Sequence, residues 1–213
     1  MHERARVAAV RRGMVYEKGK RVLDLVLAGG VLLFLAPVLL LVVAAIRLES
    51  GGPAMFRQDR VGKDGTIFRV SKFRTMRVGA HTSGEGGKVR EDRPLDPQDP
   101  AITRVGRLLR ATSLDELPQL INVLRGEMSL VGPRPTIPEQ AARYGPRERI
   151  RLSVPPGLTG LAQVSGRNEL SWPERIEIDL DYVARRSFAL DLAIILRTPW
   201  ALIRRRGVYR RGE

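Results

Sequence analysis

The chain has 213 residues, of which 43% are hydrophobic, so it can bury the core of one domain of ordinary size. It has no cysteine and only two histidines, His2 and His81, which excludes disulfides, thiolate metal sites and a histidine zinc cluster. Lysine and arginine outnumber aspartate and glutamate by 37 to 23, which gives a formal net charge of +14. Such an excess predicts a polyanionic neighbour: nucleic acid, anionic lipid or a phosphorylated ligand.

A long apolar segment, from Val22 to Ile46, contains a single charged residue, Asp24. As a helix with a rise of about 1.5 Å per residue, it would cross a hydrocarbon core of roughly 30 Å with some tilt. Basic residues flank it on both sides, so the charge distribution favours neither orientation. Pro37 lies past its middle and predicts a break at Ala36-Pro37. Two structures fit this pattern: a re-entrant helix that returns both flanks to one face of the membrane, and a single span kinked at the proline.

Residues 54–78 alternate apolar and polar side chains around Lys63-Asp64-Gly65. This pattern predicts a β-hairpin that turns at Asp64-Gly65. Lys72 and Arg74 share one face of its second strand and could bind an anionic ligand there, although most such residues are simply solvated. The next segment, 79–100, is rich in Gly, Asp, Pro and Arg and has no packing periodicity, so we expect a mobile loop that could cover a site.

Two further segments favour helices at a membrane surface. Residues 101–111 combine an apolar face with arginines, which is typical of a basic amphipathic helix on anionic lipid. Residues 190–208 carry Trp200 within an apolar run and include the cluster Arg204-Arg205-Arg206. This composition also fits an interfacial helix, and packing against the soluble core is the alternative.

The segment Thr112–Leu120 places two adjacent carboxylates, Asp115 and Glu116, near the start of a helix. Pro118 is tolerated only in the first turn of a helix, so both carboxylates belong at its N-terminal end, among free backbone N–H groups. Such a place keeps a carboxylate ionised and attracts phosphate, which suits a nucleophilic aspartate acting on a phosphorylated substrate. The alternative is helix capping, because Ser113 and Glu116 have the spacing of a capping box.

A second motif follows within one helix length. In Val131-Gly132-Pro133-Arg134-Pro135, the two prolines restrict the backbone on both sides of Arg134. A guanidinium that is held in place in this way recognises phosphate well. The proximity of the two motifs therefore favours phosphoryl chemistry over capping alone.

Six features in this order resemble the small monotopic polyprenyl-phosphate phosphoglycosyl transferases, a family of bacterial sugar transferases, over residues 18–206. They are the apolar segment with its central proline, Lys72–Met76, Thr112–Leu120, Val131–Pro135, Pro156–Gly160 and Ser165–Asn168. Any one of them is a weak signal, whereas six at compatible spacing are specific. One feature departs from the pattern: the family usually has Ser-Pro at the helix break, where this chain has Ala36-Pro37.

The resemblance implies transfer of a sugar phosphate from a UDP-sugar to a polyprenyl phosphate, such as undecaprenyl phosphate, with release of UMP. Asp115 would be the nucleophile that forms a covalent phosphosugar intermediate, which predicts ping-pong kinetics. Glu116 would bind Mg²⁺ together with Asp115, or assist the second attack. The remaining candidates are basic or amide residues: Arg134, Lys72, Arg74 and Arg110 for the substrate phosphates, and Gln163, Arg167 and Asn168 for the nucleotide sugar.

The resemblance also implies an α+β, mainly helical monotopic protein and favours the re-entrant form of the anchor. We expect a basic tail at 1–17, a re-entrant helix at 18–48 and a catalytic domain at 49–213, on the cytoplasmic face of a bacterial inner membrane. Expected partners are the UDP-sugar, polyprenyl phosphate and anionic lipid, and a homodimer is left open. The alternatives are a membrane scaffold and a tethered nucleic-acid binder, but aromatic residues make up only 5% of the chain. No residue type indicates which sugar is transferred.

Overall fold

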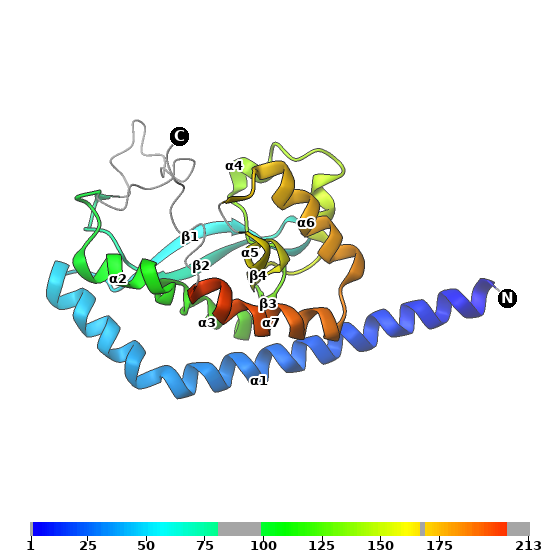
Figure 1. The fold of residues 1–213 in the computed structure, drawn as a ribbon, viewed down its shortest axis with the longest axis horizontal. Helices are drawn as coiled ribbons and strands as arrows, with labels where there is room; N and C mark the ends of the chain where they lie inside the picture. The colour runs from blue at the N-terminus through cyan, green and yellow to red at the C-terminus, as the bar shows by residue number, and fades with distance from the viewer. Residues whose placement is uncertain (1, 81–98, 167–168, 204–213) are drawn as a thin grey trace.

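The computed structural model describes residues 2–80, 99–166 and 169–203, with side chains from Val15 onward. It is mainly helical, with one long helix running beneath a smaller domain (Figure 1). In chain order the elements, with η marking a 3₁₀ turn, are α1 (His2–Ser50), β1 (Met55–Val61), η1 (Lys63–Gly65), β2 (Ile67–Phe73), α2 (Arg104–Thr112), η4 (Leu114–Glu116), α3 (Gln119–Arg125), β3 (Ser129–Val131), α4 (Pro138–Ala141), η5 (Glu148–Ser153), β4 (Gly157–Thr159), α5 (Leu161–Ser165), α6 (Trp172–Arg185) and α7 (Phe188–Ile203). Most of the loop expected at 79–100 lies outside the described residues, as does the cluster Arg204-Arg205-Arg206.

Helix α1 is a single helix that bends along its length (Figure 1). Pro37 lies inside it, and the helix continues through Ala36-Pro37, so the expected break is a bend. A proline removes one backbone hydrogen bond and crowds the preceding turn, which bends a helix without ending it when the neighbouring turns remain paired. The residues expected as a basic tail also belong to this helix, from His2 onward. Within the described part of the chain, Val15–Ser50 is the one helical stretch long and apolar enough to cross a membrane.

The arm of α1 before Pro37 is fixed to the domain by polar contacts. Lys20 Nζ lies 2.7 Å from Asp191 Oδ2 of α7, and both side chains are buried. Arg21 donates to two carbonyl groups in the last turn of α3. Asp24 accepts a hydrogen bond of 3.0 Å from the backbone N–H of Leu130. The only charge inside the apolar segment therefore binds the domain.

The buried Lys20–Asp191 pair gives a stability prediction. Asp191 also accepts hydrogen bonds from the hydroxyls of Tyr16 and Tyr182, so Lys20→Met leaves a buried carboxylate with two neutral donors. Removing one partner of a buried ion pair costs about 3 kcal/mol or more, so thermal unfolding in nanodiscs should occur at a clearly lower temperature. Lys18→Met changes an exposed lysine two residues away on the same helix and is the matched control. Equal melting temperatures for the two variants would contradict the prediction.

The arm of α1 after Pro37 packs on the same domain through apolar side chains. Ile46 is buried in a cluster with Phe73 of β2 and Leu109 of α2. Glu49 accepts hydrogen bonds from the backbone N–H groups of Arg104 and Val105, at 2.6 and 2.9 Å, at the start of α2. Both arms of the bent helix are thus in contact with one domain.

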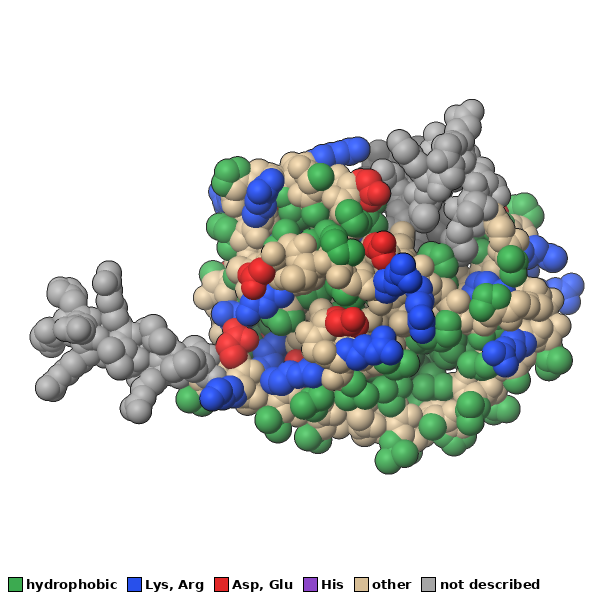
Figure 2. Space-filling view, turned by 180° about the vertical axis from the view of Figure 1, so that it is seen from behind, with side chains coloured by type: hydrophobic (Ala, Val, Ile, Leu, Met, Phe, Trp, Pro, Cys, Tyr) green, Lys and Arg blue, Asp and Glu red, His purple; other side chains and the backbone are tan. Residues whose placement is uncertain are grey.

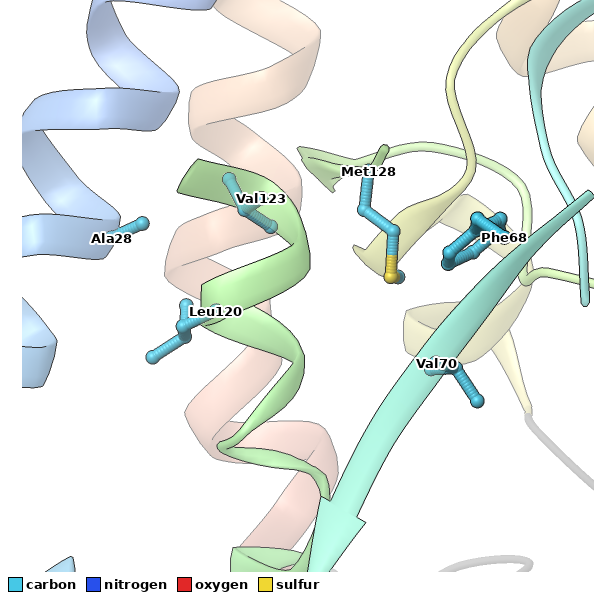
Figure 3. Close-up of a cluster of buried hydrophobic side chains, with 6 residues drawn as sticks. All are labelled: Ala28, Phe68, Val70, Leu120, Val123 and Met128. Carbon is cyan, nitrogen blue, oxygen red and sulfur yellow. The ribbon is translucent and has the colours of Figure 1, made fainter. Parts of the chain in front are cut away.

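The predicted hairpin is confirmed. Strands β1 and β2 pair in antiparallel register, and Asp64 and Gly65 at the turn have φ of 54° and 82°. Side chains of β2 reach a core cluster shared with α1 and α3 (Figure 3), formed by Ala28, Phe68, Val70, Leu120, Val123 and Met128. This core fixes the hairpin, α1 and α3 relative to one another.

A second, parallel pair of strands, β3 and β4, was not expected from the sequence. It brings together the glycine-rich ends of two motifs, Val131–Pro135 and Pro156–Gly160. A Cβ on Gly157 would lie 2.1 Å from the backbone nitrogen of Gly132, so only glycine permits this approach. The two loops therefore act as one unit that carries Arg134.

Apolar side chains remain exposed along α1, α2 and α7. Figure 2 shows them along the lower edge of the molecule, which α1 forms. In α7 one face is buried through Ile194, whereas Leu196 and Trp200 are 69% and 57% exposed, so this helix both packs on the core and presents apolar surface. In α2, Leu109 is buried and Leu108 is exposed. Surfaces of this kind are typical of contact with a membrane or a partner protein.

Candidate active site

Asp115 and Glu116 lie on the 3₁₀ turn η4 rather than on an α-helix, because α3 begins only at Gln119 with Pro118 as its N-cap. The expectation that they begin an α-helix was therefore wrong by one turn. Ser113 adopts a left-handed conformation with φ of 57°, and its side chain makes no capping hydrogen bond. The left-handed residue separates α2 from η4. Helix capping alone thus does not explain the pair.

Glu116 is bound by two cations from different elements. Arg134 donates from Nη2 to Oε1 at 2.6 Å and from Nη1 to Oε2 at 3.2 Å, a two-pronged contact. Lys72 Nζ of β2 lies 3.3 Å from Oε1. Half of the Arg134 side chain is exposed, so an incoming anion can reach it. The structure therefore brings three predicted site residues together.

The two carboxylates have opposite electrostatic environments. Burial and then the charge of Glu116 raise the pKa of Asp115, whereas Lys72, Arg110 and Arg134 lower it, and together they bring it to about 6. Burial also raises the pKa of Glu116, but Arg134 and then Lys72 outweigh it and hold that pKa well below its ordinary value. Within the described residues, hydrogen bonds engage the carboxylate of Glu116 and none engages that of Asp115. Asp115 is thus ionised at neutral pH and available for attack.

This arrangement predicts the direction of a pKa change. In metal-free protein Asp115 should titrate near pH 6, and Glu116→Gln should lower that pKa, because a neighbouring negative charge is removed and the cations that bound it become unscreened. Infrared spectra of the protonated carboxyl group, recorded against pH and referenced to Asp115→Asn, measure it. Glu177→Gln removes an exposed carboxylate on α6 and should leave the titration unchanged. A pKa that is unchanged or raised in Glu116→Gln would contradict the prediction.

The other two predicted phosphate ligands, Arg110 and Arg74, lie in different places. Arg110 Nε donates to Thr75 Oγ1 at 2.8 Å, and its charge is close enough to lower the pKa of Asp115. Arg74 is buried, and its Nη2 donates to Ser50 Oγ at 2.8 Å and to the carbonyl of Gly51. The structure thus places Arg74 at the end of α1, where it binds Ser50 and Gly51.

Of the three residues expected to bind the nucleotide sugar, Arg167 and Asn168 lie outside the described residues. Gln163 lies in α5, and both polar atoms of its amide are inaccessible and have no hydrogen-bond partner among the described residues. Its Oε1 faces Gly160, where an added Cβ would come within 2.6 Å. Gly160 packs in turn on the carbonyl of Gly132, so Gln163 lies behind the loop that carries Arg134.

Asp115 and Glu116 have the chemistry of a magnesium site completed by substrate. Within the described residues there is no group of three or more Asp, Glu, His or Cys side chains that could bind a metal on its own. Mg²⁺ is usually held by one or two protein carboxylates together with substrate phosphates, and carboxylate oxygens are its preferred ligands. Two adjacent carboxylates match that number of protein ligands, and in this structure Arg134 and Lys72 bind the oxygens of Glu116.

Sequence reasoning missed a group of residues behind Arg134. Arg151 of η5 is buried, and it donates from Nη2 to Asp179 Oδ2 of α6 at 2.5 Å and to the carbonyl of Arg134 at 3.1 Å. Nothing local distinguishes Arg151 from the exposed arginines of the same segment, Arg147 and Arg149. Only the fold brings it to the turn that carries Arg134.

Comparisons with known proteins identify the family of this chain. The family model described as bacterial sugar transferase matches residues 15–205. The chain is 48% identical over 201 residues to the UDP-glucose:undecaprenyl-phosphate glucose-1-phosphate transferase of Caulobacter vibrioides, covering 86% of this chain and 69% of that protein. It is 40% identical over 199 residues to the exopolysaccharide production protein ExoY of Rhizobium meliloti, covering 89% and 88%. It is 38% identical over 203 residues to the undecaprenyl-phosphate galactose phosphotransferase of Salmonella typhimurium, covering 89% and 41%. The resemblance inferred from the motifs is confirmed: the chain belongs to the bacterial sugar transferase family and is an enzyme of that class.

Proposed function

We propose that this enzyme transfers a sugar phosphate from a UDP-sugar to a polyprenyl phosphate, such as undecaprenyl phosphate, and so begins assembly of a membrane glycoconjugate such as an exopolysaccharide. The observation that carries the proposal is the pair Asp115–Glu116 surrounded by the charges of Lys72, Arg110 and Arg134. Two of the relatives reported above, from Caulobacter vibrioides and Salmonella typhimurium, are named as transferases of a sugar phosphate to undecaprenyl phosphate, which supports the same class of donor and acceptor.

In the first step a carboxylate oxygen of Asp115 attacks the phosphorus that bears the sugar. A bond forms between that oxygen and phosphorus, and the bond from phosphorus to the bridging oxygen breaks, so UMP leaves with the electron pair. The sugar phosphate is then attached covalently to Asp115. An aspartate whose carboxylate accepts no hydrogen bond from the described residues, and which is ionised above about pH 6, suits this role.

In the second step a phosphate oxygen of the polyprenyl phosphate attacks the same phosphorus. The bond to Asp115 breaks, the carboxylate is restored, and a polyprenyl diphosphate sugar is released. Because UMP leaves before the lipid reacts, the kinetics should be ping-pong. Glu116, which lies beside the reacting carboxylate, stays ionised throughout because its pKa is held low.

The basic residues neutralise phosphate charge during both steps. Arg134 offers a planar two-pronged donor, whereas Lys72 acts as a point charge. Arg110 approaches from α2. Mg²⁺, held by Asp115 and Glu116 with the substrate phosphates, would supply further neutralisation of charge. Gln163, Arg167 and Asn168 remain candidates for the nucleotide-sugar end.

The membrane arrangement we propose is a re-entrant anchor on the cytoplasmic face of the bacterial inner membrane. A helix that crossed the bilayer would place its two flanks on opposite sides. Here the flank before Pro37 contacts Asp191 and the flank after it contacts Leu109, both in one domain. The exposed apolar residues of α1, α2 and α7 and the net positive charge support seating on anionic lipid. Such a seat holds Asp115 near the headgroup phosphate of the lipid substrate.

The test uses the full chain in nanodiscs with Mg²⁺, undecaprenyl phosphate and a panel of radiolabelled UDP-sugars. We expect equal amounts of UMP and labelled lipid with at least one donor, and neither product when chelator replaces Mg²⁺. UMP release that is independent of lipid and continues over many turnovers would indicate a hydrolase. No product with any donor in a broad panel would favour a membrane scaffold.

A further inference from the structure

Arg151 is a buried arginine that the two reaction steps do not use. Its side chain is 4% exposed, and its charge is balanced by Asp179, whose side chain is 3% exposed. Its Nη1 donates to the Tyr144 hydroxyl at 2.5 Å, and its guanidinium carbon lies 5.6 Å from the ring centroids of both Tyr144 and Trp172. A buried ion pair often contributes little net stability, because desolvation offsets the attraction. Stability alone therefore does not account for this buried pair.

One contact of Arg151 is with the backbone of the phosphate-binding turn. Arg151 Nη2 bridges Asp179 Oδ2 and the carbonyl oxygen of Arg134, at 2.5 and 3.1 Å. A guanidinium donates to a backbone carbonyl in a fixed direction, since its five N–H groups lie in one plane. The ion pair with Asp179 fixes that plane, so it also fixes the carbonyl.

The turn has few other means of holding its shape. Pro133 and Pro135 have no backbone N–H, so the turn must be held largely through its carbonyl groups. Pro133 O accepts from the N–H of Gly157 at 2.8 Å, Arg134 O accepts from Arg151, and Pro135 O accepts from Arg60 Nη1 at 3.4 Å. Three consecutive carbonyls are thus bound by three separate segments, and the middle one belongs to the residue that contacts Glu116.

We propose that Arg151 is a positioning residue for Arg134: by binding the Arg134 carbonyl, it sets the place from which the Arg134 guanidinium reaches Glu116 and the substrate phosphate. The inference rests on the proposed function, since it requires Arg134 to bind phosphate. Asp179 and Tyr144 complete the arrangement, because they orient the guanidinium of Arg151. None of these three touches the reacting atoms.

The test is a double-mutant cycle that combines Arg151→Lys with Arg134→Lys, read as kcat and KM for UMP release in nanodiscs. Because misplacement of a contact by about 1 Å can cost two orders of magnitude in rate, we expect Arg151→Lys to lower kcat about tenfold or more with little change in KM. In the Arg134→Lys background the same change should have less than about twofold effect, since the residue that Arg151 positions is already altered. The loss in kcat should thus be strongly non-additive.

A matched control exists on the same two elements. Arg147, next to η5, pairs with Glu177 of α6 on the surface, where their side chains are 72% and 57% exposed. Glu177→Gln should leave kcat unchanged in both backgrounds. If Arg151→Lys melts below the assay temperature, Tyr144→Phe removes a single hydrogen bond to Arg151 and supports the same cycle.

The outcomes separate the inference from the proposed function. A loss caused by Arg151→Lys that is the same size in both backgrounds would show a merely structural role and overturn the positioning inference, with the proposed function intact. An Arg134→Lys variant of full activity would also overturn the positioning inference, because the geometry of Arg134 would then not matter, and the proposed function would stand. Absence of UMP release with every donor would overturn the proposed function itself. A large loss in kcat when Arg151→Lys is made in the wild-type protein, with little further loss in the Arg134→Lys variant, would establish the inference.

Discussion

Wild-type protein incubated with Mg²⁺ and a radiolabelled UDP-sugar, without lipid, should become labelled, and Asp115→Asn should not. The label should be lost when polyprenyl phosphate is added, with transfer to the lipid. Loss of a nucleophile costs at least about a thousandfold in turnover, so Asp115→Asn should have almost no activity with the complete set of substrates. Denaturing gels of the labelled protein, with UMP measured in parallel, provide the readout.

Loss of activity in Asp115→Asn should not arise from unfolding. Burial raises the pKa of Asp115 from 3.8 to about 6, so the folded state binds this proton more tightly than the unfolded state does. The ionised carboxylate is therefore a cost to folding at neutral pH, and stability falls as pH rises from about 4 to about 6. The asparagine variant should melt at the same temperature as wild type or higher at pH 7.5, with no such advantage below pH 3.8.

Two other outcomes would identify a different mechanism. Labelling of Asp115→Asn would assign the nucleophile to another residue, with Glu116 the first to examine. Wild type that stays unlabelled but forms lipid product on addition of polyprenyl phosphate would indicate direct attack by the lipid. Glu116→Gln is the variant to compare with Asp115→Asn, because it removes the neighbouring charge and leaves the proposed nucleophile in place.

Much of this site could be predicted from sequence because its signals are local. Alternating residues and Asp64-Gly65 define the hairpin that carries Lys72, and the two prolines identify the turn of Arg134. Asp115 and Glu116 are adjacent in the chain, so no fold was needed to bring them together. What the fold added was the difference between them: the cations of two other elements bind Glu116 and leave Asp115 available.

The roles of individual arginines could not be predicted from local sequence. The chain has 37 lysines and arginines, and local sequence does not separate those that bind substrate from those that secure the fold. Arg74 was expected at the phosphates, and it lies buried at the end of α1. No local signal marks Arg151, and it contacts the carbonyl of Arg134. Each assignment depends on partners far away in the chain, which hydrophobic periodicity and turn signals do not report.

Whether α1 breaks or bends at Pro37 also depends on partners far away in the chain. Pro37 correctly predicts that the helix is not straight, but a proline alone does not decide whether a helix breaks or bends. The outcome depends on whether both arms find something to pack on. Here Asp24 binds the N–H of Leu130 and Ile46 packs on Leu109, so a continuous helix can follow the domain on both sides of the proline.

Replacing Arg134 should have the second largest effect on activity. Arg134→Met removes a charge and both prongs of a donor, and loss of a preorganised donor to developing phosphate charge costs about 100-fold or more in kcat/KM. Arg134→Lys keeps the charge but loses the planar fork, so a smaller loss of about tenfold is expected. Arg143→Met, which changes an exposed arginine on the surface beyond α4, is the control and should leave kcat/KM unchanged.

The pH profile distinguishes the charge of Arg134 from its geometry. Arg134 is one of three cations that lower the pKa of Asp115, so its removal should raise that pKa above about 6 and move the acid limb of kcat/KM to higher pH. The deficit of Arg134→Met should therefore be larger at pH 6.5 than at about pH 8.5, whereas that of Arg134→Lys should be nearly the same at both. An acid limb that does not move in Arg134→Met would mean that its charge does not act on Asp115. In that case Arg134 would act through its contacts with Glu116 and the substrate phosphate, and the ionisation of the nucleophile would depend on Lys72 and Arg110.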